Sequence, residues 1–109
     1  MARSAITITA PTRAGVSLPA ATVGDPVDNH TIANDGRVVL LVENTGSTVS
    51  RTVTLHLART VDGFSVAPRT VSVPVGETWI LGPYQPDDYG KSLLVDVDNA
   101  ELEIRAVRI

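Results

Sequence analysis

The sequence predicts an all-β fold, and two observations carry that prediction: short segments of alternating apolar and polar residues, and an abundance of Val, Ile and Thr. In residues 51–57, for example, Val53, Leu55 and Leu57 share one face. A period of two is typical of half-buried strands, because successive side chains leave a strand on opposite faces. β-Branched residues suit that pleated surface. We therefore predict an antiparallel β-sandwich, immunoglobulin-like or jelly-roll-like, of about 7–8 short strands with an extended N-terminal arm.

Turn signals divide the chain into these strands. Asn34-Asp-Gly36 precedes one strand, and Asn44-Thr-Gly-Ser-Thr48 separates it from the next, so residues 37–43 and 51–57 are expected to pair as a hairpin. Asp98-Asn-Ala100 predicts a second hairpin between the last two strands. Residues 82–90 read as a loop, and no helix is expected. Strands are predicted over residues 5–9, 37–43, 51–57, 69–75, 78–81, 92–97 and 101–109.

The apolar residues of these strands predict the core. Residues 38–42 are apolar without interruption, which predicts a central strand covered on both faces. Pro74 cannot donate a ladder hydrogen bond, so its strand is expected to be an edge strand or to end there. The predicted core consists of Val39, Leu41, Val53, Leu55, Val71, Val73, Ile80, Val95, Val97, Leu102 and Ile104.

A chain of 109 residues predicts a single domain with two differing parts. Residues 1–36 are expected to form an N-terminal strand and an extended arm or loop, and residues 37–109 the sandwich. Residues 10–36 are rich in Pro, Ala, Gly and Asp and have no periodicity. They form either a surface loop or an arm that lies on a partner. Their sparse apolar residues, Val16, Leu18, Val23 and Val27, are candidate partner contacts.

Charge and composition exclude several classes of protein. The net charge is −3 and Lys91 is the single lysine, so no basic patch for nucleic acid is expected. The absence of Cys excludes disulfides and Cys-ligated metals. No run of ~18 apolar residues predicts a membrane span. The N-terminal residues contain no apolar core of a signal peptide, so we expect synthesis in a cytoplasm.

The polar residues do not suggest catalysis. Asp96, Asp98, Glu101 and Glu103 alternate with core residues, so we expect a solvated outer face of the last hairpin and no metal site. His30 is expected in the irregular segment and His56 on an outward strand face, and no nucleophile motif accompanies them. We predict no catalytic residue, no cofactor and no enzymatic activity.

The few aromatic residues allow two interpretations. Trp79, Tyr84 and Tyr89 lie close together in the sequence and are able to form a sugar-stacking platform or to pack internally. Tyr89, just before a strand, resembles the tyrosine corner of immunoglobulin-like sandwiches. Val61 and Phe64 are expected to pack beneath the turn at residues 60–63. Phe64, Trp79 and Tyr84 join the candidate partner contacts.

The order of motifs also resembles a family. Asn34-Asp-Gly-Arg-Val-Val-Leu-Leu-Val-Glu-Asn-Thr-Gly46 is followed by Thr60-Val-Asp-Gly63, Val71-Ser-Val-Pro-Val-Gly-Glu-Thr78, Gly82-Pro-Tyr-Gln-Pro-Asp-Asp-Tyr-Gly90 and Arg105-Ala-Val-Arg-Ile109. This order resembles the small β-rich capsid decoration (minor capsid) proteins of tailed bacteriophages, especially those infecting actinobacteria.

The resemblance implies a virion structural protein on the capsid exterior, made in the host cytoplasm, with no enzymatic activity. Its expected partners are the major capsid protein and copies of itself, with a trimer as the first expectation. Residues 1–36 and the loops at 60–66 and 82–90 are expected to make the contacts. The alternatives are a carbohydrate- or cell-surface-binding module that takes a host-surface glycan, or a phage tail or connector component.

Overall fold

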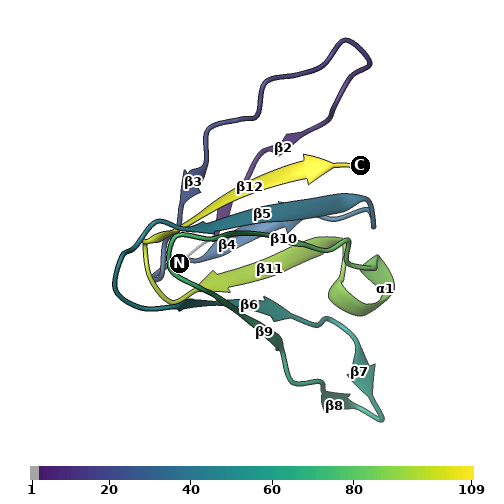
Figure 1. Cartoon of the computed structure of the whole chain (residues 1–109). Helices are drawn as coiled ribbons and strands as arrows, with labels where there is room; N and C mark the ends of the chain where they lie inside the picture. Colours follow the sequence, from purple (N-terminus) through teal and green to yellow (C-terminus); the bar gives the residue numbers. More distant parts are fainter. Residues whose placement is uncertain (1–2) are drawn as a thin grey trace.

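The structure is a computed structural model that describes residues 3–109; residues 1–2 of the expected arm lie outside the described residues. Residues 3–109 form two five-stranded sheets, a small two-stranded hairpin and one short helix (Figure 1). Sheet A has the order β1-β4-β11-β6-β9, with β1 (Ser4–Ala5), β4 (His30–Ala33), β11 (Ser92–Val97), β6 (Arg51–His56) and β9 (Arg69–Val73). Sheet B has the order β10-β5-β12-β2, with β10 (Thr78–Leu81), β5 (Val38–Asn44), β12 (Leu102–Arg108) and β2 (Ile8–Thr9); β3 (Thr22–Val23) also pairs with β12. The prediction of an all-β fold is confirmed.

Strand β5 is the central strand of sheet B, as its apolar sequence indicates. It pairs with β12 from Val38↔Arg108 to Asn44↔Leu102 and with β10 on its other side. Strand β9 lies at the edge of sheet A, which confirms the expectation from Pro74. The sheets are mixed, however, because β1 runs parallel to β4 and β2 runs parallel to β12. The prediction of wholly antiparallel pairing is therefore wrong at the two short N-terminal strands.

The two predicted hairpins are also wrong. Residues 37–43 belong to sheet B and residues 51–57 to sheet A, and the last two strands are divided between the sheets in the same way. The side chain of Asn44 accounts for the first crossing: its Nδ2 donates to the carbonyl oxygens of Val49 (3.1 Å) and Val73 (3.0 Å), and its Oδ1 accepts from the Gly46 N–H. These bonds lead the chain from sheet B toward sheet A. A turn signal in the sequence predicts where the chain turns, but it does not predict which strand the following strand pairs with.

The inward faces of both sheets form one apolar core. Of the predicted core residues, Val53, Leu55, Val73, Val95, Val97, Leu102 and Ile104 are buried. Val71 is only partly buried. Strand β5 instead buries Val38, Leu40 and Val42, so Val39 and Leu41 lie half-buried on the outer face of sheet B. Ile80, opposite Leu41, is 69% exposed. When every residue of a strand is apolar, either the odd-numbered or the even-numbered side chains can face the core. The sequence alone does not show which of the two sets is inward.

The N-terminal segment is not a separate arm over its whole length. Strand β4 lies between β1 and β11 inside sheet A, and Ile6 is buried in the core. Only residues 10–21, between β2 and β3, lack strand structure and project from the body (Figure 1). The expected loop at 82–90 contains one helical turn, α1 (Pro86–Tyr89), which begins at a proline. Within residues 3–109 no helix is long and apolar enough to cross a membrane.

The core assignment predicts a clear contrast between two leucines. Leu55 is fully buried, whereas Leu94 on the neighbouring strand β11 is 36% exposed. We expect Leu55→Ala to lower the free energy of unfolding by about 2–5 kcal/mol, because it removes buried methyl groups and leaves a cavity. Leu94→Ala, the matched control, should cost about 1 kcal/mol or less. Urea unfolding monitored by circular dichroism measures both, and equal losses would contradict this core.

Candidate functional site

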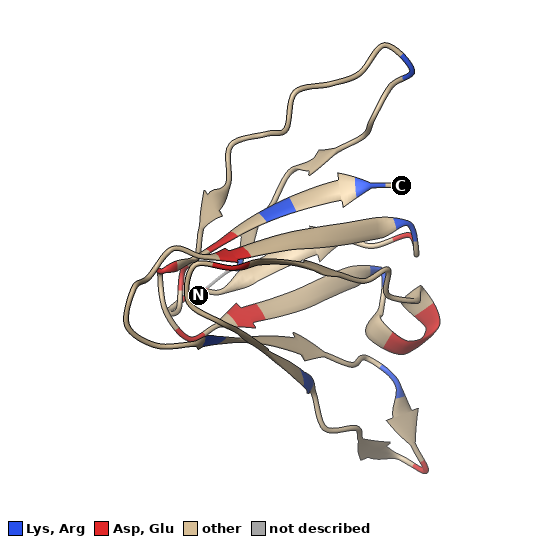
Figure 2. Ribbon diagram, in the orientation of Figure 1, with Lys and Arg blue, Asp and Glu red and all other residues tan. Residues whose placement is uncertain are grey.

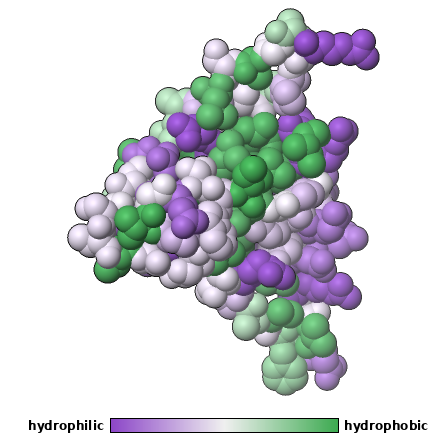
Figure 3. Space-filling model, in the orientation of Figure 1, coloured by the Kyte–Doolittle hydropathy of each residue, from purple (hydrophilic) through white to green (hydrophobic). Residues whose placement is uncertain are grey.

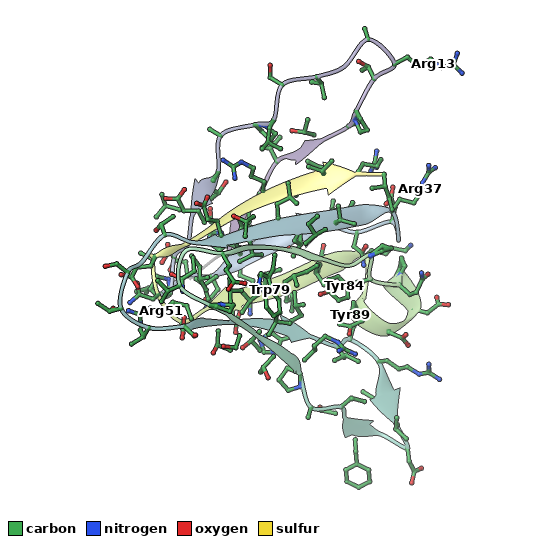
Figure 4. The ribbon with its side chains drawn as sticks, viewed as in Figure 1. Arg13, Arg37, Arg51, Trp79, Tyr84 and Tyr89 are labelled. Atoms are coloured by element: carbon green, nitrogen blue, oxygen red, sulfur yellow. The ribbon has the colours of Figure 1, made fainter. Side chains whose placement is uncertain are left out.

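A groove lies where the edges of the two sheets meet. It lies between β9 and β10, the edge strands of sheets A and B, and one end is closed by α1. Figure 4 shows Trp79 of β10, Tyr84 just before α1 and Tyr89 at the end of that helix. The groove has a volume of about 570 Å³, and its main lining side chains are Arg69, Val71, Trp79, Ile80, Tyr84 and Tyr89.

Two buried tyrosines lie at the helical end of this groove. The rings of Tyr84 and Tyr89 pack with centroids 4.7 Å apart at 56°, and each residue is 8% exposed. Arg69 Nε donates to the Tyr89 hydroxyl over 3.0 Å. Burial, with a further contribution from Tyr89, raises the pKa of Tyr84 to about 12, although the charge of Arg69 opposes this rise. Tyr84 is therefore part of the core and not an exposed sugar platform. Tyr89 also differs from a tyrosine corner, since its hydroxyl meets a side chain.

The exposed wall of the groove comes from β10. Trp79 is partly exposed, and its Nε1 donates to Glu77 Oε1 over 2.9 Å. Ile80 lines the groove and is also continuous with Leu41 on the outer face of sheet B. Sequence reasoning placed Ile80 in the core and so missed it as a surface residue. Ile80 faces outward because it is paired with Leu41, one of the outward-facing residues of β5. Only the register of the two strands reveals this pairing.

A first projection is the β2–β3 loop, which we define as residues 10–21. Val16 and Leu18 are more than half exposed there, and Arg13 lies at the tip, pointing away from the body (Figure 4). The loop is fixed at its end: Arg105 Nε donates to the Pro19 carbonyl over 2.7 Å. Gly24 then packs so closely on β12 that an added Cβ would lie 2.6 Å from the Leu102 carbonyl oxygen.

A second projection is the β7–β8 hairpin, residues 60–65, formed by β7 (Thr60–Val61) and β8 (Phe64–Ser65). Its base is held because the N–H groups of Ala58 and Arg59 donate to the Asp88 carbonyl of α1. At its tip, Val61 and Phe64 are 61% and 74% exposed. Val61 and Phe64 were expected to pack beneath the turn, and that expectation is wrong for both. The hairpin extends away from the sheets on the side opposite the β2–β3 loop (Figure 1).

The outer faces of the two sheets differ in polarity. Sheet B carries a cluster of outward apolar side chains: Val39, Leu41, Ile80 and Val107. Figure 3 shows apolar surface on the β2–β3 loop, in a central band and on the β7–β8 hairpin, among other places. Sheet A is mostly polar outside, although Leu94 is exposed there opposite His56. On this face Asp96 accepts hydrogen bonds from Arg3 and from His56. Partial burial raises the pKa of Asp96, but these hydrogen bonds and charges together outweigh that effect and hold the pKa below its ordinary value.

The remaining polar residues form no chemical centre. Acidic and basic residues are interspersed over the surface (Figure 2), and residues 3–109 contain no group of three His, Cys, Asp or Glu that could hold a metal. His30 lies in β4, not in an irregular segment, and is buried with Nε2 accepting from the Asp25 N–H and Nδ1 facing the Ser4 carbonyl. The four predicted carboxylates do not share one face: Asp96 belongs to sheet A, whereas Glu103 belongs to sheet B.

The structure therefore separates most of the predicted contact residues. Trp79 and Tyr84 share the groove. Val16 and Leu18 lie on the β2–β3 loop, and Phe64 lies on the opposite projection. The two others, Val23 on β3 and Val27 in the turn before β4, are exposed outside these features.

Comparison of the chain with models of protein families, with curated proteins and with solved structures found no match.

The packing of Tyr84 predicts a pH dependence. Because the neutral phenol is favoured in the fold, its pKa rises from 10.0 to about 12. The contribution of Tyr84 to stability is thus present below about pH 10 and is lost as the pH rises through about 12. Phenolate absorbance of the wild type minus that of Tyr84→Phe isolates this residue. A difference curve with its midpoint near pH 10 in the folded protein would contradict the packing.

Proposed function

We propose that this chain is a virion structural protein that decorates or cements the outer surface of a tailed-phage capsid. It is made in the host cytoplasm, carries no enzymatic activity, and binds the major capsid protein and copies of itself. The β2–β3 loop and the adjoining outer face of sheet B are the parts that contact the capsid.

The observation that carries this proposal is the exposure of Val16 and Leu18 on a projecting loop. Both side chains are more than half exposed, and the loop lies beyond the sheets (Figure 1). Exposed apolar surface of this kind is typical of a protein contact, since water contact with apolar carbon is unfavourable. The hydrogen bond from Arg105 to Pro19 joins the loop to the outer face of sheet B, so one partner surface can cover both.

The order of the strands supports a jelly-roll-like sandwich as the scaffold. One sheet has the order β3-β12-β5-β10 and the other β4-β11-β6-β9. All neighbouring strands in these two orders are antiparallel. Among these eight strands, successive strands along the chain lie in different sheets, with one exception: β6 and β9 are neighbours in the same sheet. Two sheets with this alternation correspond to the double Greek key of a jelly roll. Jelly rolls occur in capsid proteins and in lectins, so the fold alone does not decide between these two functions.

A glycan-binding module is the second candidate. The exposed ring of Trp79 in a groove that also contains Gln85 and Asp88 favours it, because sugars stack on aromatic rings and hydrogen-bond to polar side chains. The burial of Tyr84 argues against it, since one ring remains where a platform needs more. A tail or connector component would differ in copy number, a handful of copies per particle against hundreds for a shell protein.

Capsid binding can be tested with point variants of the loop. Deleting residues 1–28 is unsuitable, because it would remove β1, β2, β3 and the buried Ile6. We expect the double variant Val16→Ser and Leu18→Ser to stay folded but to bind capsids at least about tenfold more weakly. Each side chain buried in a contact contributes ~1.5–3 kcal/mol, and 1.4 kcal/mol corresponds to a factor of ten.

The measurement is co-sedimentation of the purified protein with capsids of the phage that encodes it. Val49→Ser, at an exposed apolar position outside the loop, is the control and should bind as the wild type does. Unchanged binding by the loop variant would exclude the loop as the capsid contact. Absence of wild-type binding, together with binding to a glycan array that Trp79→Ala abolishes, would favour the second candidate.

A further inference from the structure

We propose that the tip of the β7–β8 hairpin of one copy docks into the groove between β9 and β10 of a second copy. This inference rests on the proposed function in one respect, that copies of the chain lie side by side. It names the residues through which they meet.

The hairpin has the properties of an inserting element. Val61 and Phe64 form a cross-strand pair, and both are mostly exposed at the end of a projection (Figure 3). Asp62 and Gly63 between them adopt positive φ angles of 53° and 80°, which form the tight turn that presents the pair. None of residues 60–65 lines the groove of its own chain. The tip therefore lacks a cover within its own copy.

The groove has the size to receive it. Its volume is about 570 Å³, whereas an apolar cavity of about 150 Å³ already accommodates a benzene ring. The ring of Phe64 and the side chain of Val61 therefore fit together. The wall offers Val71, Trp79 and Ile80, so that apolar surface would be buried on both copies.

Charge complementarity selects this partner. Asp62 carries a carboxylate at the tip that makes no hydrogen bond or ion pair within residues 3–109, and Arg59, the nearest arginine in the sequence, pairs with Asp88 instead. Arg69 lines the groove and uses only Nε, toward Tyr89, which leaves its terminal nitrogens for an incoming carboxylate. Tip and groove thus match in both apolar character and charge. The tip and the groove are different surfaces of the same chain, so the contact between two copies is heterologous. When the copies close into a ring, every tip occupies the groove of a neighbouring copy.

The contact is small, so it should be weak between two free copies and strong in a ring or on a shell. Stable interfaces bury at least about 1,200 Å², more than one hairpin tip provides. Ring closure or attachment to a lattice makes each further contact intramolecular and raises the effective concentration. The test must therefore detect weak, specific pairs.

Because the chain contains no cysteine, single cysteines report the contact without interference. We would mix Ser65→Cys, on the hairpin, with Gln85→Cys, on the groove, and measure mixed disulfides by mass spectrometry under mild oxidation. Neither substitution removes an apolar contact. The matched control mixes Val27→Cys, another exposed position, away from the hairpin, with Gln85→Cys. We expect several-fold more mixed disulfide from the hairpin pair, and equal yields would overturn the proposal.

Charge reversal tests the same contact without oxidation. By sedimentation at high protein concentration, Asp62→Arg and Arg69→Glu should each weaken self-association by about tenfold, and the double variant should recover most of it. Failure of the double variant to recover would overturn the charge pairing. Phe64→Ser should weaken self-association as well, whereas Val27→Ser should not.

Capsid binding of the same variants is measured separately. A chain that sediments with capsids but gives no hairpin-to-groove disulfide overturns this inference alone. If Phe64→Ser loses capsid binding while its self-association is unchanged, the hairpin contacts the shell and the inference is likewise wrong.

Discussion

The structure depends on the burial of one face of each sheet against the other. Leu40 and Val42 of β5 belong to the same core cluster as Val53 and Leu55 of β6 and Val95 of β11, and all five are fully buried. Because side chains alternate along a strand, this burial decides which residues face outward on every strand. The buried Asn44 connects the two layers, since its amide reaches the Val73 carbonyl of sheet A from β5 of sheet B. Removing that amide would leave buried polar groups without partners, which is costly.

The same constraint produces the candidate contact surfaces. Two packed sheets leave edge strands, and here β9 and β10 are edges that face one another across a groove. Several apolar residues lie outside the core and are exposed: Ile80 beside the groove, Val16 and Leu18 on the β2–β3 loop, and Phe64 on the β7–β8 hairpin. A chain that exposes apolar side chains on opposite projections fits a protein held between a surface and its own neighbours. This arrangement is the physical basis of the proposed capsid role and of the proposed contact between copies.

Sequence periodicity predicted the strands well and their partners poorly. The segments at 51–57, 78–81 and 92–97 form strands close to the predicted bounds, because alternation is a local property. Pairing is not local: β5 meets β10 and β12 after the chain has crossed between sheets, and no turn motif encodes that crossing. Val39 and Ile80 were assigned to the core because apolar character alone does not reveal which face is inward. Of the candidate contact residues, Trp79 and Tyr84 share the groove, although Tyr84 proved to be buried, and Val16 and Leu18 share the β2–β3 loop.

The central claim is that the two sheets are a scaffold and that the two projections make the contacts. Hydrogen exchange of the free protein against the protein bound to capsids tests it most directly, because amides become protected where a partner covers them. We predict added protection in residues 10–21 and 60–65 and along the groove strand β10, with the inner strands β6 and β11 unchanged. Protection confined to other surfaces, with the loop and hairpin exchanging as in the free protein, would contradict the account.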